Sequence, residues 1–245
     1  MAGTTAERQE ASFIKIIKKS VLTNKGNPIT VMAGNVTIKG VISAEKYPGR
    51  QEGGSEPYTD VVIYTTNKTK PKINLSLKGP SAPSLAGGGL KGLELAAPGI
   101  TSKFLKTVFK KLSTVLKLNP GDKVPDVYGE ISGGMKTKIV VGNARMGGPI
   151  DYMYIGLMDV TGAYDSKKNL LKINGGHFYE SKKYATSHKL YFRLRARRED
   201  QRFDPKAKDG SGVPKIYGKS PSRGDSAGRI VVTDKVPSNG VIVKI

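Results

Sequence analysis

Apolar and polar positions follow two different periods along the chain, which predict a mixture of helices and strands. Over residues 5–21, apolar side chains recur three and four positions apart, the spacing that places them on one face of a helix. The same spacing predicts a second helix over residues 101–118. The lysines of this second segment, among them Lys103, Lys106 and Lys110, fall on the side opposite its apolar stripe.

Runs of β-branched residues between turn-forming residues predict strands. Residues 30–42 predict a hairpin around a central Ala-Gly-Asn turn. Further strands are predicted over residues 59–65, 72–78, 137–141, 151–159, 170–174, 189–195, 229–233 and 241–244. Residues 44–57, 79–99 and 199–226 are rich in turn-forming residues and predict loops.

These elements predict an α/β (α+β) fold in which helices flank a central mixed sheet. A change near residue 120 divides the chain into a core over residues 1–120 and a β-rich part over residues 121–245. The second part is either the completion of the same domain or a nucleic-acid-binding extension.

The net charge favours a polyanionic partner. The 245 residues include 41 Lys and Arg against 20 Asp and Glu, a formal net charge of +21. Such an excess repels itself, and phosphate backbones are the commonest partners that relieve the repulsion. An inert basic surface is the alternative explanation.

The scarcity of some residue types excludes several function classes. The chain has no cysteine and only two histidines, His177 and His188, which argues against disulfides, thiolate chemistry and zinc sites. No apolar run long enough to span a bilayer occurs, and the first residues lack the pattern of a secretory signal. We therefore expect a cytoplasmic protein without a membrane partner. The glycine-rich, cysteine-free composition is compatible with a virus-encoded protein, for example from a phage.

The segment from Asp60 to Lys78 carries candidate chemistry. Asp60 begins one predicted strand and Lys78 ends the next, so an antiparallel pairing would bring the two side chains within a few ångströms if the register permits. A carboxylate there would hold a divalent cation, and a lysine beside it would orient a water molecule.

This arrangement resembles the PD-(D/E)xK nuclease superfamily, whose core is restriction-endonuclease-like. The match consists of Asp60, a hairpin, the sequence Ser76-Leu77-Lys78 and a following helix, with an acid-bearing helix before them. The resemblance covers roughly residues 1–118. It implies Mg²⁺ or Mn²⁺ bound by Asp60 and the backbone carbonyl of Leu77, with Lys78 serving the nucleophilic water. Glu10 matches the auxiliary acid of the first helix, because it shares the apolar face.

Ser76 departs from the family, which usually has Asp or Glu at this position. The departure leaves the metal one carboxylate short, and Glu52 or Glu56 is a candidate to supply it. The hypothesis is a Mg²⁺-dependent endonuclease acting on duplex DNA. A homodimer would suit such an enzyme, because two strands need two sites. The alternative hypothesis is a non-catalytic nucleic-acid-binding or phage virion structural protein. A ribosome- or RNA-associated protein is a third hypothesis.

Residues 189–198 carry a second candidate surface. Tyr191, Arg193, Arg195 and Arg197 alternate with apolar residues, so on a strand they would share one face at about 6.5–7 Å for each two-residue step. That spacing suits successive phosphates, with Arg198 beside them and Tyr191 stacking on a base or sugar. The alternative is a solvent-facing strand whose charges prevent aggregation. Lys103, Lys106 and Lys110 would form either a further contact or a solvated helix face.

Overall fold

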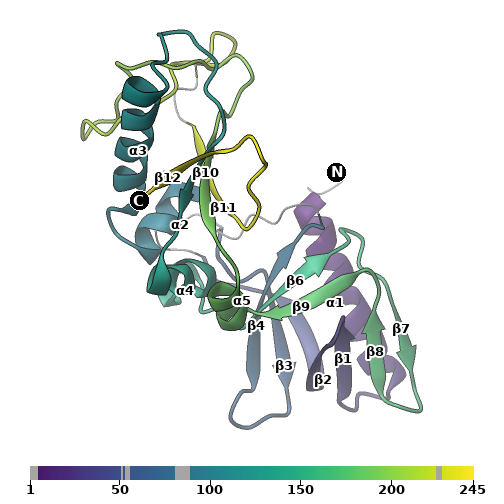
Figure 1. Cartoon of the computed structure of the whole chain (residues 1–245). Coiled ribbons are helices and arrows are strands. Elements are labelled where there is room, and N and C mark those ends of the chain that lie inside the picture. Colours follow the sequence, from purple (N-terminus) through teal and green to yellow (C-terminus); the bar gives the residue numbers. More distant parts are fainter. Residues whose placement is uncertain (1–4, 51, 53–55, 81–88, 225–227) are drawn as a thin grey trace. The chain divides into compact units, whose positions relative to one another are not determined.

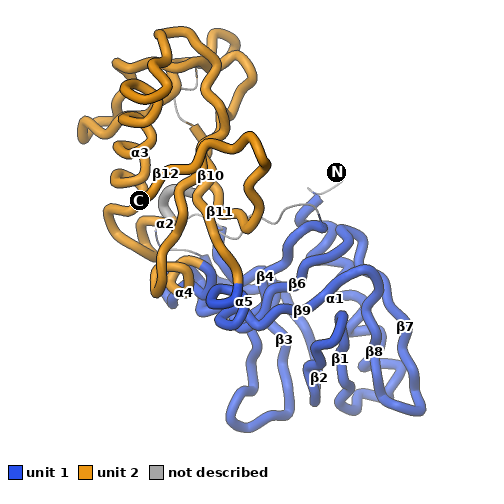
Figure 2. Tube along the Cα trace, viewed as in Figure 1, with its two compact units in different colours: residues 1–83, 140–187 blue, residues 84–139, 188–245 orange. Residues whose placement is uncertain are grey.

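The structure, a computed structural model, describes residues 5–50, 52, 56–80, 89–224 and 228–245. The chain divides into two compact units (Figure 2). Unit 1 contains residues 1–83 and 140–187, and unit 2 contains residues 84–139 and 188–245. The change expected near residue 120 therefore falls inside unit 2. No described helix combines the length and the apolar character needed to cross a membrane.

Unit 1 is built on one mixed sheet of eight strands in the order β7-β8-β1-β2-β3-β4-β6-β9. Its strands are β1 (Ile29–Ala33), β2 (Val36–Lys46), β3 (Val61–Thr65), β4 (Lys72–Lys78), β6 (Tyr152–Gly156), β7 (Gly162–Asp165), β8 (Leu170–Ile173) and β9 (Gly176–Glu180). The pairs β1–β8 and β4–β6 are parallel, and the other neighbours are antiparallel. The long helix α1 (Thr5–Thr23) and the short helices α5 (Ser181–Ser187) and η2 (Ala144–Met146) complete the unit.

The core of unit 1 lies between α1 and one face of this sheet (Figure 1). The ring of Phe13 packs against Tyr154 and Phe178, with ring centroids 5.4 and 6.2 Å apart. Leu75 and Leu77 of β4 belong to the same buried cluster. These contacts fix which face of β4 points toward α1, and this matters for the site below.

Unit 2 is built on a four-stranded sheet in the order β11-β10-β5-β12. Its strands are β5 (Val127–Glu130), β10 (Tyr191–Arg195), β11 (Arg229–Thr233) and β12 (Val241–Lys244). Its helices are α2 (Gly89–Ala96) and α3 (Ile100–Lys110), which continues into a π-helical turn over Lys111–Val115. Phe104 of α3 packs against Phe192 of β10 with ring centroids 5.5 Å apart, so α3 covers one face of the sheet.

Both predicted long helices and the hairpin near the N-terminus are present in the structure, but two predictions of secondary structure are wrong. Residues 137–141, predicted as a strand, are the end of helix α4 (Gly133–Val141). A short apolar run does not distinguish a strand from a buried helix, and burial of Ile139 and Val140 decides the outcome here.

The loop predicted over residues 79–99 contains helix α2, and residues 81–88 of this segment lie outside the described residues. Leu93, Ala96 and Ala97 are buried and have the spacing of one helix face, so the signal was present among the glycines. Strands β5, β7 and β9 and helix α5 were not predicted either.

We expect Phe13→Ala to lower the free energy of unfolding by about 3–5 kcal/mol, because it leaves a cavity between α1 and the sheet. Lys15→Ala on the exposed side of the same helix should change it by less than about 0.5 kcal/mol. Urea denaturation followed by circular dichroism measures both. Equal stability of the two variants would contradict the packing of α1 described above.

Candidate functional site

Asp60 immediately precedes β3 and is bonded to the end of β4. Its Oδ2 accepts a hydrogen bond from the backbone N–H of Leu77 at 2.6 Å and another from Oγ of Ser76 at 3.0 Å. Its own backbone N–H donates to the carbonyl of Leu75 at 2.9 Å. Within the described part of the chain, no hydrogen bond to Oδ1 is recorded. One carboxylate oxygen is thus fixed by β4, and the other remains available to a ligand.

Lys78 lies on the same face of β4 as Ser76. Side chains alternate along a strand, and Leu75 and Leu77 point into the core beneath α1, so Ser76 and Lys78 point to the other face. Ser76 is 1% exposed and Lys78 is half-buried. Asp60 reaches Ser76 and therefore lies on this same face. Among the described residues no ion pair within 4 Å joins Asp60 to Lys78.

Gln9 of α1 lies next to the ends of β4 and β6 and holds them together. Its side chain is buried, and its Nε2 donates to the carbonyls of Lys78 and Gly156 at 3.2 Å and of Leu157 at 3.1 Å. Sequence reasoning missed this residue. The signal was a polar side chain four positions before Phe13, inside the apolar stripe of the helix.

Glu10 reaches the sheet through Lys46, the last residue of β2. Lys46 Nζ lies 2.8 Å from Glu10 Oε2, and the Glu10 side chain is only 15% exposed. The pKa of Lys46 is raised, first by its hydrogen bond with Glu10 and by the charge of Glu10, then by the charges of Glu7 and Asp60. Lys46 and Glu10 thus meet on the α1 side of the sheet, whereas Asp60 lies with Ser76 on the opposite face, and no hydrogen bond or ion pair between Lys46 and Asp60 is recorded among the described residues. The structure therefore does not bring the two predicted acids, Glu10 and Asp60, together. Nothing in the sequence indicated the contact between Lys46 and Glu10.

The other predicted metal ligands, Leu77, Glu56 and Glu52, are less well placed to bind a cation beside Asp60. The side chain of Leu77 is buried, and its backbone N–H is used by Asp60. Glu56 is exposed four residues before Asp60. Glu52 is bonded to Arg145, with Oε2 2.5 Å from Nε, and this contact lowers the pKa of the Glu52 carboxyl. Glu52 is therefore already neutralised by an arginine.

The donor set can be tested for a divalent cation. Among the described residues no group of three or more His, Cys, Asp or Glu side chains is arranged to hold a metal ion. Mg²⁺ needs fewer protein ligands, because it keeps several waters and commonly takes one or two carboxylates together with substrate phosphates. Asp60 offers one such carboxylate through Oδ1, whereas Glu10 lies on the α1 side of the sheet and is neutralised by Lys46. The residues fit a Mg²⁺ ion that retains most of its water.

In unit 2 the arginines predicted on one strand have different surroundings. Strand β10 ends at Arg195, so Arg197 and Arg198 lie in the turn beyond it. Tyr191 is buried rather than presented to a base. Arg193 is bonded to Asp126, with Nε 2.9 Å from Oδ2, and its guanidinium lies 5.9 Å from the ring centroid of Tyr128. Arg193 is thus largely engaged inside the protein.

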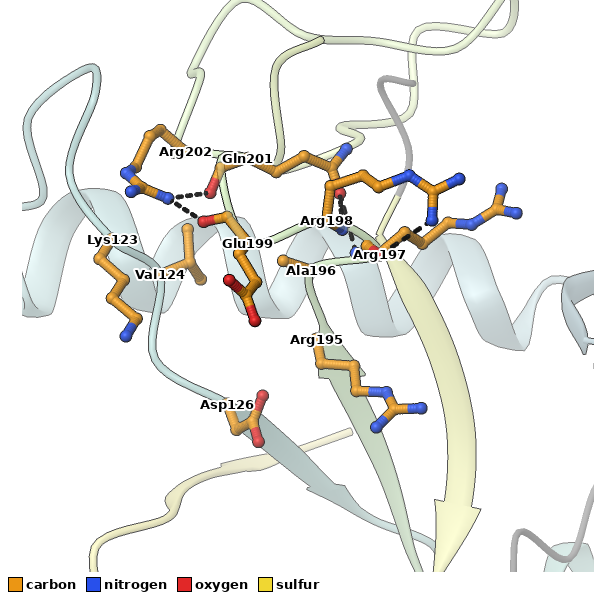
Figure 3. A pocket seen from close by; sticks show the side chains of 10 residues that line it. All are labelled: Lys123, Val124, Asp126, Arg195, Ala196, Arg197, Arg198, Glu199, Gln201 and Arg202. Atoms are coloured by element: carbon orange, nitrogen blue, oxygen red, sulfur yellow. Dashed lines mark hydrogen bonds between the residues drawn. The ribbon is translucent and has the colours of Figure 1, made fainter. Parts of the chain in front are cut away.

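Arg195, Arg197 and Arg198 line a pocket of about 640 Å³ in unit 2 (Figure 3). The other side chains around it include two further cations, Lys123 and Arg202, and two acids, Asp126 and Glu199. The lysines predicted as a second contact, Lys103, Lys106 and Lys110, are exposed on α3. Helix α3 covers the sheet face that carries Phe192, whereas Arg195 points to the opposite face because it is three residues further along β10.

We expect Ser76→Asp to lower the free energy of unfolding by about 2 kcal/mol without divalent metal, because it buries a second carboxylate beside Asp60. Millimolar Mg²⁺ should restore most of the loss, since a cation relieves the repulsion. Thermal unfolding with and without Mg²⁺ measures this, and Ser166→Asp in an exposed turn is the control. If Mg²⁺ does not change the melting temperature of Ser76→Asp, no cation binds beside Asp60.

We expect Arg193→Gln to lower the free energy of unfolding by about 1 kcal/mol, because Asp126 loses its partner. Arg195→Gln removes the same charge from the same strand face, but no carboxylate partner of Arg195 is recorded among the described residues. It should therefore not lower the stability in urea denaturation, and it should raise the stability slightly because Arg195 lies opposite Arg229 on the neighbouring strand. A larger loss for Arg195→Gln than for Arg193→Gln would contradict these assignments.

Three comparisons with known proteins return nothing similar. No protein-family model matches the chain, no curated protein matches it, and no solved structure matches it. The function of this chain therefore has to be argued from its own residues and their geometry.

Proposed function

We propose that unit 1 hydrolyses phosphodiester bonds of nucleic acid with the help of Mg²⁺, most simply as a DNA endonuclease. The observation that carries the proposal is the position of Asp60, whose carboxylate is bonded to the strand that presents Ser76 and Lys78 on one face. This arrangement is similar to the PD-(D/E)xK pattern that the sequence suggests. The net charge of +21 supports a polyanionic substrate.

Each residue has a role that follows from its position. Asp60 would hold the cation through Oδ1, together with the substrate phosphate and water molecules. When bound, Mg²⁺ would polarise the scissile phosphate and lower the pKa of a bound water. The Lys78 ammonium would orient the attacking water and stabilise the negative charge that develops on the phosphate. Ser76 would keep the Asp60 carboxylate in place by donating to Oδ2. Gln9 would hold the backbone of Lys78.

A non-catalytic nucleic-acid-binding protein, such as a phage virion component, is the second candidate. Two observations favour it: Ser76 offers a hydroxyl where a carboxylate would bind metal, and Lys46 already neutralises Glu10. On this alternative, Asp60 has only the structural role of joining β3 to β4. It predicts salt-dependent binding without turnover.

We expect wild-type protein to relax and linearise supercoiled plasmid in Mg²⁺ but not in EDTA. Asp60→Asn and Lys78→Gln should each slow cleavage by about 100-fold or more, because each removes a group that acts on the reacting phosphate. Asparagine retains an acceptor for the Leu77 N–H, so the fold should survive, and circular dichroism checks this. Asp165→Asn on β7, at the other edge of the sheet, is the control.

The outcomes separate the two candidates. Cleavage that is equal in wild type, Asp60→Asn and Lys78→Gln would show that a contaminating nuclease or another site is responsible. Absence of cleavage by folded wild type, together with binding that weakens as salt rises, would favour the non-catalytic protein.

A further inference from the structure

Arg195 and Arg229 form a like-charged pair in unit 2. Strands β10 and β11 are antiparallel, and Arg195 is directly opposite Arg229 in their register. Side chains at directly opposite positions share a face, and two like charges there destabilise the sheet. No carboxylate partner of either arginine is recorded within the described residues. An anion bound between the two guanidinium groups would relieve this repulsion.

The turn after β10 adds two more arginines, Arg197 and Arg198. Hydrogen bonds to a buried glutamine hold the backbone of this turn. Gln201 is 1% exposed, and its Oε1 accepts hydrogen bonds from the backbone N–H groups of Arg197 and Arg198 at 2.8 and 3.1 Å. Next to it, Asp200 accepts hydrogen bonds from Ser220 Oγ at 2.7 Å and from Ser222. These bonds lower the pKa of Asp200 to about 2. The turn is therefore held in one conformation, which reduces the entropy lost when a ligand binds.

The described side chains that line the pocket carry more positive than negative charge. Five cations and two acids line the pocket, and the carboxylate of one of these acids, Asp126, is already bonded to Arg193. The Nε of Arg198 is buried without a hydrogen-bond partner. In Figure 3 the guanidinium groups of Arg195, Arg197 and Arg198 lie on one side, and Glu199 and Asp126 lie between them and the side of Lys123 and Arg202.

We propose that Arg195, Arg197, Arg198 and Arg229, here called the arginine cluster, bind the phosphate groups of a nucleic-acid backbone. Guanidinium groups suit phosphate oxygens because they donate paired, charge-assisted hydrogen bonds. The cluster extends from a strand end into a turn, so it suits successive phosphates better than a single one. The site needs no metal and no cleavage, and so it goes beyond the hydrolysis proposed for unit 1.

The test is binding of the full chain to fluorescent oligonucleotides in EDTA, measured by anisotropy over a range of salt concentrations. Arg195→Gln, Arg198→Gln and Arg229→Gln should each weaken binding by about 10-fold, the effect of losing one charged hydrogen-bond contact. Each should also reduce the slope of log K against log salt by about 0.9 for duplex DNA. Glu199→Gln should tighten binding, because it removes a negative charge beside the cluster.

Lys244→Gln on β12 is the matched control, because it removes one exposed positive charge from the opposite edge of the same sheet. Melting temperatures show that the variants fold, and Arg229→Gln should melt slightly higher than wild type because the cross-strand repulsion is gone. Arginine variants that bind as well as Lys244→Gln would overturn the proposal. So would loss of binding only in variants that no longer fold.

Competition with pyrophosphate and ATP distinguishes a nucleic-acid backbone from a small phosphate ligand. We expect both to displace the oligonucleotide only at concentrations at least 100-fold above that of an unlabelled oligonucleotide. Equal potency of pyrophosphate and oligonucleotide would overturn the assignment to nucleic acid. Because no Mg²⁺ is present, the result is independent of whether unit 1 cleaves.

Discussion

The hydrogen bonds from Ser76 and Leu77 to the carboxylate of Asp60 determine the chemistry open to unit 1. They join Asp60, the residue before β3, to the end of strand β4. They use the Oδ2 atom of the carboxylate and leave the Oδ1 atom available. A carboxylate fixed in this way has a defined orientation, which a metal ligand requires. The same bonds would serve a purely structural purpose equally well. The difference between a nuclease and a binding protein therefore depends on whether Oδ1 of Asp60 binds a cation.

Local patterns predicted more of unit 1 than of unit 2. The stripe of α1 and the hairpin joining β3 to β4 are encoded by residues close in sequence, so the approach of Asp60 to Ser76 could be anticipated. Lys46 and Gln201 act across distances in the fold that no periodicity reveals. The short run over residues 137–141 has the composition of a strand, and its burial in a helix depends on partners elsewhere in the chain.

The arginines of β10 show how little a charge pattern says by itself. Arg193 and Arg195 lie two residues apart on one strand face and are indistinguishable in the sequence. Arg193 meets Asp126 and Tyr128, whereas Arg195 meets Arg229. The first arrangement stabilises the fold, and the second places two positive charges opposite each other with no carboxylate partner recorded among the described residues. Positive charge is thus divided between structure and binding by partners distant in sequence.

The interleaved order of the two units has a consequence for synthesis on the ribosome. The chain leaves unit 1 after Pro83 and returns only at Val140, so β4 emerges long before its parallel neighbour β6. Until β6 has been made, the edge of β4 has unpaired backbone N–H and C=O groups that can pair with a strand of another chain. Translation must therefore produce most of the chain before the large sheet can close, and the first 83 residues made alone would be expected to aggregate.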